Sequence, residues 1–422
     1  MSSQEMTEVS VLKLTLHDWL VGYLIGYQNG RNVLSFADEF KQNPNRPTFS
    51  LITHPNFPRS EKLMNESWVR NQRIHPTLSN LLPEGSMREL ISQNLKVHIE
   101  NEFPIFFFLG TDLPGALIAE SLLPDEVPDT ILAIHGKSKV LNFNRSKLVN
   151  KFSLAGVQIK FSMKEKEGRY TISQSNVLGD WIVKTPSTKH QHVPENEFTA
   201  MTLASQVGIH IPEIKLIDLN KLDNLPAINL PNEKLAFAIK RFDRDGSSRI
   251  HMEDFAQVLV KYPHDKYTSV NYEQIGRILY QYSGEGLTDA QQFARRLLVN
   301  ILLANGDAHI KNWSLLYSDQ ITPKLAPAYD IVTTSVYIDD ERHYALNLGK
   351  NKDWYKASFD HFESWSKKAR VPWRAIKPHL KDTLEKARSL WPKALKNLPM
   401  IEAHKKKLQD HWSRLHTDFR IN

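Results

Sequence analysis

The sequence predicts an α+β protein in which a strand-rich lobe is followed by a helical lobe, with a small α+β subdomain before both. From roughly 145 to 245, short apolar runs alternate with turns around a single helical segment. Beyond 250, most apolar segments have helical spacing instead. With 422 residues, 41% hydrophobic and 24% charged, the chain is long enough for two or three domains with a large core.

The N-terminal subdomain is expected at residues 1–125. Segments 8–16 (EVSVLKLTL) and 23–27 (YLIGY) are typical of strands, and 86–95 (SMRELISQNL) has helical spacing. Residues 122–131 (LLPDEVPDTI) contain two prolines and three acids, which indicates a linker or surface loop. We therefore expect the strand-rich lobe at 126–245 and the helical lobe at 246–422.

The strand-rich lobe is predicted from four segments. Residues 153–163 (SLAGVQIKFSM), 181–186 (WIVKTP) and 234–243 (KLAFAIKRFD) indicate strands. Residues 195–208 (ENEFTAMTLASQVG) have helical spacing and end at glycine, as helices often do. A sheet carrying one helix is the simplest arrangement of these elements.

The helical lobe is predicted from the spacing of its apolar residues. Helices are expected at 252–260 (MEDFAQVLV), 272–284 (YEQIGRILYQYSG) and 288–305 (TDAQQFARRLLVNILLAN), with Thr288 as the N-cap of the last. The chain beyond 375 is helical and basic, and it contains no repeat or low-complexity tract.

Composition excludes several classes of protein. Because the chain has no cysteine, it has no disulfide framework, no thiolate metal site and no cysteine nucleophile, and a reducing cytoplasm is the expected location. The first residues lack the pattern of a signal peptide, and no apolar run is long enough for a membrane span, so no membrane partner is expected. A net charge of +7 permits an acidic partner or nucleic acid without requiring either.

Residues 302–317 (LLANGDAHIKNWSLLY) carry more polar chemistry than a turn between a helix and a strand requires. Asp307 and Asn312 have the D-x-x-x-x-N spacing of the protein-kinase catalytic loop, where Asp accepts the proton of the attacking hydroxyl and Asn binds magnesium. Asp330, in 325–334 (LAPAYDIVTT), offers a second carboxylate for such an oxygen-rich site.

Upstream residues fit the same chemistry. Lys184 ends the WIVK strand in the manner of a lysine that pairs with nucleotide phosphates, and Glu195 or Glu197 in the next helix could hold it. No G-x-G-x-x-G precedes Lys184; instead the small residues Ala155 and Gly156 in 153–160 (SLAGVQIK) would let backbone N–H groups approach phosphate. Each of these elements alone is weak evidence for a kinase site, but their order across two lobes predicts phosphoryl transfer.

Eight segments together resemble the successive motifs of the HipA-family serine/threonine kinases, the toxins of bacterial toxin–antitoxin pairs. They are 80–90 (NLLPEGSMREL), 111–117 (TDLPGAL), 153–163 (SLAGVQIKFSM), 195–204 (ENEFTAMTLA), 239–244 (IKRFDR), 249–257 (RIHMEDFAQ), 306–312 (GDAHIKN) and 326–331 (APAYDI). The resemblance covers nearly the whole chain and implies a two-lobed, kinase-like fold with ATP and Mg²⁺ as cofactors.

The resemblance also implies roles for individual residues. Asp307 would be the catalytic Asp, Asn312 and Asp330 the magnesium ligands, and Lys240 to Phe242 the hinge facing adenine. The implied ATP contacts are Ala155, Gly156, Val157, Gln158, Ile159, Lys160, Lys184, Lys240, Arg241, Phe242, His309, Lys311, Asn312, Tyr329 and Asp330. Lys240 and Ile159 depart from the family pattern, which has acids at these positions. Autophosphorylation of Ser153 is implied as well, and the added charge would expel the phosphate loop.

The implied substrate is a serine of an aminoacyl-tRNA synthetase, whose modification stalls translation and growth. The implied partner is a small HipB-type antitoxin that binds DNA, through which the kinase would meet operator DNA. Two alternatives stay open, a catalytically silent co-repressor module and a small-molecule or lipid kinase. His190, His192, Glu195 and Glu197 offer a zinc site, but without cysteine or an H-E-x-x-H pattern a polar loop over the nucleotide site is favoured.

Overall fold

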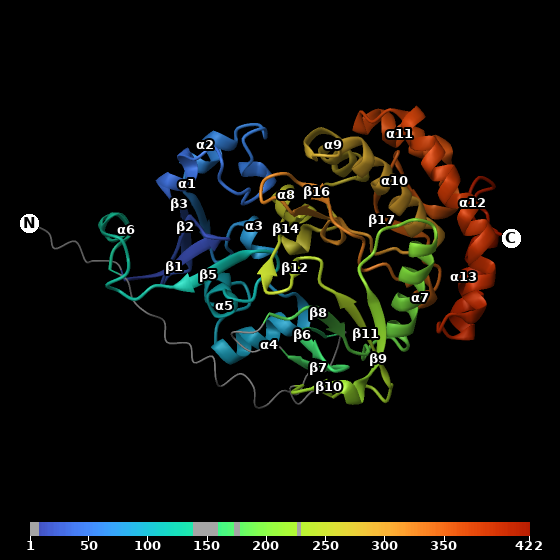
Figure 1. Cartoon of the computed structure of the whole chain (residues 1–422), viewed down its shortest axis with the longest axis horizontal. Coiled ribbons are helices and arrows are strands. Elements are labelled where there is room, and N and C mark those ends of the chain that lie inside the picture. The colour runs from blue at the N-terminus through green and yellow to red at the C-terminus, as the bar shows by residue number, and fades with distance from the viewer. Residues whose placement is uncertain (1–7, 138–158, 173–177, 226–228) are drawn as a thin grey trace, which may run out of the picture.

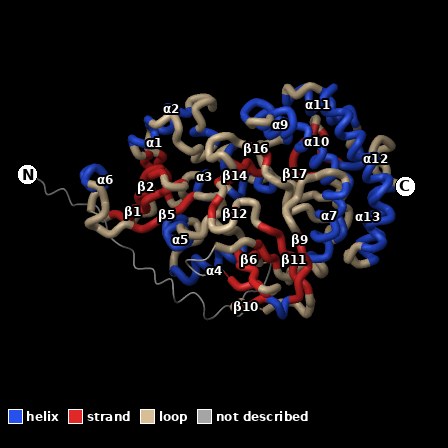
Figure 2. Tube along the Cα trace, viewed as in Figure 1, coloured by secondary structure: helices blue, strands red, loops and turns tan. Residues whose placement is uncertain are grey.

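The computed structural model describes residues 8–137, 159–172, 178–225 and 229–422. The chain runs from an N-terminal domain at one end, through a strand-rich region, to a layer of helices at the other end (Figure 1). Strands gather in the first two regions, and long helices cover the C-terminal side (Figure 2). This arrangement confirms the predicted α+β organisation.

The N-terminal domain is built on a five-stranded antiparallel sheet with the order β4-β3-β2-β1-β5. Its strands are β1 (Val9–Leu16), β2 (Trp19–Tyr27), β3 (Arg31–Phe36), β4 (Trp68–Asn71) and β5 (Leu117–Ser121). The helices of this part are α1 (Asp38–Gln42), α2 (Ser60–Asn65), α3 (Pro76–Ser79), α4 (Gly85–Leu95), α5 (Glu102–Leu109) and α6 (Asp129–His135). One face of the sheet buries leucines of β1 against Phe106 of α5, which gives this domain its own core.

The strand-rich lobe contains a six-stranded sheet with the order β10-β7-β6-β8-β11-β9. Its strands are β6 (Lys160–Lys166), β7 (Arg169–Ile172), β8 (Trp181–Lys184), β9 (Ile214–Asp218), β10 (Leu222–Asp223) and β11 (Leu235–Lys240). Helix α7 (Val193–Gln206) packs against β9 and β11. Because β6 and β8 pair with Lys160 opposite Lys184, the sheet places two lysines side by side.

The helical lobe carries the largest core. Its main helices are α9 (Tyr272–Tyr282), α10 (Gly286–Leu302), α11 (Phe359–Ala369), α12 (Trp373–Asn397) and α13 (Glu402–Arg414), with short α8 (Phe255–Val258) before them. Its strands are β14 (His251–Asp254), β15 (Ser314–Tyr317), β16 (Lys324–Leu325), β17 (His343–Leu348) and β18 (Asn351–Asp353), preceded by the two-residue strands β12 (Arg244–Asp245) and β13 (Ser248–Arg249). Trp354, Trp365 and Trp391 are fully buried here.

The last helix closes the end of a central one. In α13, Trp412 Nε1 donates to the carbonyl of Leu302 at 2.9 Å, and His411 Nε2 lies 2.8 Å from the carbonyl of Ile301. The final carbonyls of an α-helix have no partner within the helix, so these side chains cap α10. The C-terminal segment is therefore part of the structure that leads into residues 303–312.

Two expectations about the helical lobe are wrong. Residues 252–260 are not one helix, because His251–Asp254 form β14 and pair with β15, leaving only Phe255–Val258 helical. Thr288 is not an N-cap, since α10 begins at Gly286 after Glu285. In the first case β15 supplies backbone partners. In the second, the Asp289 amide donates to the Glu285 carbonyl at 2.9 Å, which puts Thr288 inside the first turn of α10.

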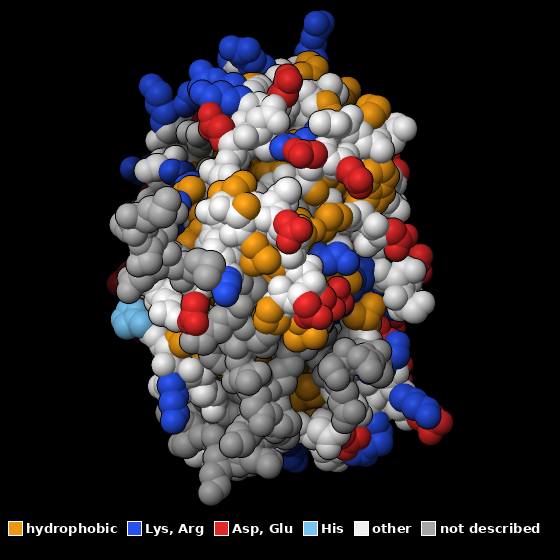
Figure 3. Space-filling model, turned by 90° about the vertical axis from the view of Figure 1, so that its left-hand side faces the viewer, with side chains coloured by type: hydrophobic (Ala, Val, Ile, Leu, Met, Phe, Trp, Pro, Cys, Tyr) orange, Lys and Arg blue, Asp and Glu red, His pale blue; other side chains and the backbone are white. Residues whose placement is uncertain are grey.

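Within the described residues, no helix combines the length and apolar character needed to cross a membrane. The face on the side of the N-terminal domain carries interspersed acidic, basic and apolar side chains (Figure 3).

A buried carboxylate joins the N-terminal domain to the helical lobe. Glu253 of β14 accepts hydrogen bonds from Ser50 Oγ and the Leu51 amide, each at 2.7 Å, and from the hydroxyl of Tyr317. Burial raises the pKa of Glu253 to about 7, although these three hydrogen bonds oppose the shift. The interface between the two parts therefore contains an acid that titrates near neutrality.

We expect this acid to make stability depend on pH. Its folded pKa is above its unfolded value, so the protonated form favours folding, and that contribution is lost as the pH rises towards 7. Replacement by glutamine removes the titration while retaining an amide oxygen for the Leu51 amide. Relative to wild type, Glu253→Gln should gain up to about 3 kcal/mol in unfolding free energy between pH 4.5 and pH 8.

Denaturant unfolding at both pH values measures this difference. The exposed change Glu402→Gln serves as the matched control and should give the same difference from wild type at both. A Glu253→Gln variant whose difference from wild type does not change with pH would contradict a titrating Glu253.

Candidate active site

A buried lysine holds three elements together. Lys184, at the end of β8, contacts the carboxylates of Glu197 in α7 and Asp330 in the loop after β16. The Lys184 side chain is only 5% exposed, so a charge that would be costly to bury alone is paired twice. Of the two predicted partners, Glu197 and not Glu195 holds Lys184.

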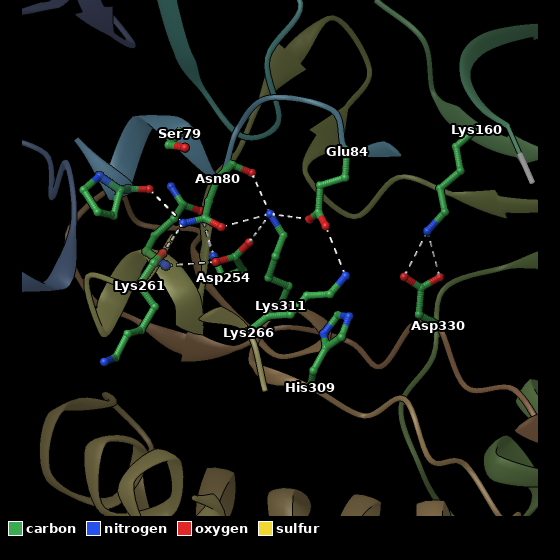
Figure 4. Close-up of polar contacts among 12 residues, drawn as sticks. Ser79, Asn80, Glu84, Lys160, Asp254, Lys261, Lys266, His309, Lys311 and Asp330 are labelled. Carbon is green, nitrogen blue, oxygen red and sulfur yellow. Dashed lines mark hydrogen bonds and ion pairs between the residues drawn. The ribbon is translucent and has the colours of Figure 1, made fainter. Parts of the chain in front are cut away.

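Lys160, opposite Lys184 in the sheet, reaches the same aspartate. Its Nζ lies 3.2 Å from Asp330 Oδ2, and its side chain is half exposed (Figure 4). Burial alone would raise the pKa of Asp330, but Lys160 and Lys184 together lower it well below its usual range. Burial raises the pKa of Glu197, with Lys184 opposing the shift. The two lysines therefore keep Asp330 in its charged form.

Asp330 also has an unusual backbone. Its φ of +54° lies in the left-handed region, which residues other than glycine seldom adopt. Asp and Asn tolerate this region better than other side chains do. The turn therefore aims the carboxylate at the lysines at some cost in backbone energy.

Asp307 lies in the turn that follows α10. Asn305 Oδ1 accepts a hydrogen bond from the Asp307 amide at 3.0 Å, and Asn312 Nδ2 donates to the Asp307 carbonyl at 2.8 Å. The Asp307 side chain is 54% exposed, and its Oδ1 accepts a hydrogen bond from the hydroxyl of Tyr267. The carboxylate is thus held open to solvent and directed at a hydroxyl group.

These residues share one cavity of about 490 Å³. Its lining includes Lys160, Lys184, Glu197, Tyr267, Asp307 and Asp330. Asn312 lines a smaller hollow that also contains Asp330, which puts the two predicted metal ligands beside each other. The structure therefore brings together residues that are up to 170 positions apart in the chain.

The residues of the predicted hinge contact other parts of the protein. The Lys240 amide donates to the carbonyl of Glu213 at 2.8 Å, and its side chain is 55% exposed. The Arg241 guanidinium pairs with Asp243 at 2.6 Å, and the ring of Phe242 packs on Tyr329 with centroids 5.7 Å apart.

Five of the remaining predicted site residues lie outside the described residues, namely Ser153, Ala155, Gly156, Val157 and Gln158. Ile159 is buried just before β6. His309 is buried near Asp307, and burial lowers its pKa to about 4, so this imidazole is neutral. The Tyr329 hydroxyl donates to the carbonyl of Lys311 at 2.8 Å, which fixes the backbone of the turn.

The amino group of Lys311 faces the N-terminal domain. Its Nζ lies 3.0 Å from Asn80 Oδ1, 3.1 Å from the Asn80 carbonyl and 3.0 Å from Glu84 Oε1 (Figure 4). Sequence reasoning did not identify Asn80 and Glu84 as site residues. The only signal was their position in segment 80–90, which contributed to the family resemblance without indicating a contact.

The histidine-rich segment divides between different neighbours. His190 packs on the ring of Tyr337, and Glu197 is taken by Lys184. His192, Glu195 and Glu233 bring three ligand atoms within 4.8 Å of one another, a grouping that could hold a metal ion. The four residues considered from sequence therefore do not form one site.

The oxygen ligands suit magnesium. Asn312 uses Nδ2 to bond the Asp307 carbonyl, so its Oδ1 is the atom left to face a cation. Asp330 is charged, and hard divalent cations prefer such carboxylate and amide oxygens. Lys160 and Lys184 beside them suit the phosphates that such an ion accompanies.

Family models match most of the chain. Residues 12–120 match the HipA N-terminal domain, and residues 152–391 match the HipA-like C-terminal domain. The chain belongs to the HipA family. The resemblance inferred from eight motifs is thereby confirmed.

Similar proteins and a solved structure agree with this family assignment. Protein Y4dM of Sinorhizobium fredii, whose name describes an inferred kinase, is 37% identical over 400 residues, covering 94% of each chain. The serine/threonine-protein kinase toxin HipA of Shewanella oneidensis is 24% identical over 327 residues, covering 70% of this chain and 71% of that one. A structure of Shewanella oneidensis HipA with HipB and operator DNA matches with a TM-score of 0.71 at 20% identity, covering 96% of this chain and 97% of that one. The HipA-like two-lobed fold is confirmed.

We expect Lys184→Met to lower stability in a pH-dependent way. Loss of the cation leaves Glu197 buried and unpaired, which should cost about 3–5 kcal/mol near pH 7.5. Since an unpaired buried Glu has a raised pKa, it protonates as the pH falls, and the loss should shrink towards pH 5. Denaturant unfolding across this range measures both effects.

Lys160→Met is the matched control, because it removes the half-exposed lysine from the same aspartate and should cost less than about 1 kcal/mol. The double variant Lys184→Met/Glu197→Gln should recover part of the loss. Equal losses for both single lysine variants at every pH would count against the buried pairing.

Proposed function

We propose that this HipA-family protein is an ATP-dependent serine/threonine kinase. The observation that carries the proposal is the single cavity in which the Lys184–Glu197 pair, Asp330 and Asp307 meet. A lysine–glutamate pair, a metal-binding Asp and an Asp that receives the acceptor proton are the recurring parts of kinase sites. Relatives named as kinases support the same conclusion.

The residues have distinct roles in this proposal. Asp307 orients the acceptor hydroxyl and accepts its proton, as its contact with the Tyr267 hydroxyl illustrates. Lys184 and Lys160 bind phosphate oxygens, and the backbone of Lys240 to Phe242 faces adenine. Loop 155–160, for which the family resemblance is the support, covers the phosphates.

Asn312 and Asp330 would hold Mg²⁺, which neutralises charge on the transferring phosphoryl group. We do not extend phosphate binding to Lys311, because oxygens of Asn80 and Glu84 surround its amino group. His309 is proposed to line the nucleotide pocket in its neutral form.

We further propose that the substrate is a serine of a protein, an aminoacyl-tRNA synthetase in keeping with the family resemblance, so that the chain acts as a toxin in the cytoplasm. A relative named as a serine/threonine-protein kinase toxin supports the toxin role. The solved complex of Shewanella oneidensis HipA with HipB and operator DNA supports a HipB-like antitoxin partner. Autophosphorylation of Ser153 is proposed as self-inactivation.

Asp307→Asn should abolish most phosphoryl transfer, by about 10²–10⁴-fold, because a positioned general base contributes about that much. ATP affinity should remain near that of wild type, since Asp307 acts on the acceptor. Radiolabelled ATP with a cell extract measures transfer, and peptide mass spectrometry should find phosphate on Ser153 in wild type alone.

The exposed Asp410→Asn is the matched control and should retain full activity. Undiminished transfer by Asp307→Asn would refute the assignment of Asp307. Label appearing in metabolites or lipids instead of protein would replace the protein substrate by a small molecule.

Asp330→Asn and Asn312→Ala should each weaken ATP binding at least tenfold, roughly, in the presence of magnesium, with little change in its absence. The reason is that both side chains act on ATP mainly through the metal ion. Calorimetric titration of ATP with and without magnesium measures the difference. Equal losses under both conditions would argue against ligand roles.

A further inference from the structure

One carboxylate of the N-terminal domain bridges two lysines of the helical lobe. Glu84 lies immediately before α4, and its Oε1 and Oε2 lie 3.0 Å from Lys311 Nζ and 3.1 Å from Lys266 Nζ (Figure 4). Asn80 adds its carbonyl and side-chain oxygens to the same Lys311 amino group. The contact therefore joins two parts of the chain through ion pairs and directed hydrogen bonds.

The amino group of Lys311 is fully occupied by this contact. A lysine ammonium has three N–H donors. Three oxygens of Asn80 and Glu84 lie within 3.1 Å of it, and Asp254 Oδ2 lies at 3.5 Å. The side chain is 12% exposed, so water screens these interactions little. Lys311 thus serves as a structural joint between the N-terminal domain and its own turn.

Each lysine that Glu84 contacts is the sequence neighbour of a residue that bonds Asp307. Lys311 belongs to the short 3₁₀ turn Ile310–Asn312, which begins three residues after Asp307 and contains Asn312, the last residue of the D-x-x-x-x-N motif. Lys266 immediately precedes Tyr267, whose hydroxyl bonds the Asp307 carboxylate. Glu84 is therefore connected to the proposed catalytic aspartate by two separate routes.

The charge on Glu84 is maintained at physiological pH. Burial would raise its pKa, but Lys311 and Lys266 lower the pKa to about 2. Besides these two lysines, Asp254, Tyr267 and His309 of the helical lobe interact electrostatically with Glu84. Lys311 pairs with both Glu84 and Asp254. The charge that Glu84 contributes to the bridge therefore does not change near physiological pH.

We propose that Glu84 is a positioning residue through which the N-terminal domain fixes the catalytic turn of the kinase site. This proposal rests on the proposed kinase function and adds to it a role for the N-terminal domain. A displacement of about 1 Å of a catalytic group can cost about 10²-fold in rate. A contact that reaches Asp307 through both Lys311 and Lys266 therefore has a large effect on turnover.

Glu84→Gln tests the proposal. Glutamine keeps the size of the side chain but loses the charge that bridges the two lysines. We expect kcat for phosphoryl transfer to fall about 10–100-fold, while the Kd for ATP with magnesium changes less than about twofold. Lys184, Lys160 and Asp330 are untouched, which explains the separation. Glu84→Asp, which retains the charge on a shorter side chain, should recover part of kcat.

Thr48→Val is the matched control. Thr48 Oγ1 donates to the Ile321 carbonyl at 2.7 Å, another contact between the N-terminal domain and the helical lobe, with no link to Asp307. Its kcat should equal that of wild type. Similar losses of kcat in Thr48→Val and Glu84→Gln would mean that any weakening of the interface suffices and would overturn the proposal.

Hydrogen exchange of residues 305–313, followed by mass spectrometry, gives a readout that needs no activity. Exchange there should be faster in Glu84→Gln than in wild type and unchanged in Thr48→Val. Unchanged exchange in Glu84→Gln, or a kcat equal to wild type, would overturn the positioning role. Failure of the wild-type protein to transfer phosphate would instead refute the proposed function, and the exchange result would still decide whether Glu84 fixes the turn.

Discussion

The buried ammonium group of Lys184 is the constraint on which the rest of the site depends. It ties a strand of the sheet, a helix and a loop of the helical lobe to one point, because Glu197 and Asp330 approach it from different elements. An isolated charge at this depth would cost several kcal/mol, roughly, so the loss of either carboxylate would leave the ammonium with one partner instead of two. The pairing is thus one of the contacts that hold the two lobes together around the cavity.

The same site is held from a second direction by the N-terminal domain. Lys184 and Lys160 meet Asp330 on one side of the cavity, whereas Lys311 and Lys266 connect the N-terminal domain to the turn that carries Asp307. The two sets of ion pairs share no residue. In the proposed mechanism, nucleotide binding and placement of the acceptor group can therefore be altered separately, and the N-terminal domain takes part in the second.

Sequence reasoning recovered the elements whose pattern is local. The strand ending at Lys184, the helix containing Glu197 and the turn 306–312 were all predicted, because period and punctuation reveal them. It could not choose between Glu195 and Glu197. Side chains two positions apart on a helix point in different directions, and only packing decides which of them faces the sheet. It assigned 252–260 to a helix because a short apolar run is compatible with both a helix and a strand. The bridge from Glu84 to Lys311 spans 227 positions, and no pattern in one sequence records such a contact.

The cap that α13 places on α10 has a consequence for the synthesis of the protein. His411 and Trp412 lie 110 positions after the carbonyls that they contact, yet they complete the end of the helix that leads directly into the turn with Asp307. While residues 402–414 are still inside the ribosome, the carbonyls of Ile301 and Leu302 lack these partners. The turn with Asp307 is therefore made well before the segment that supports the helix leading into it.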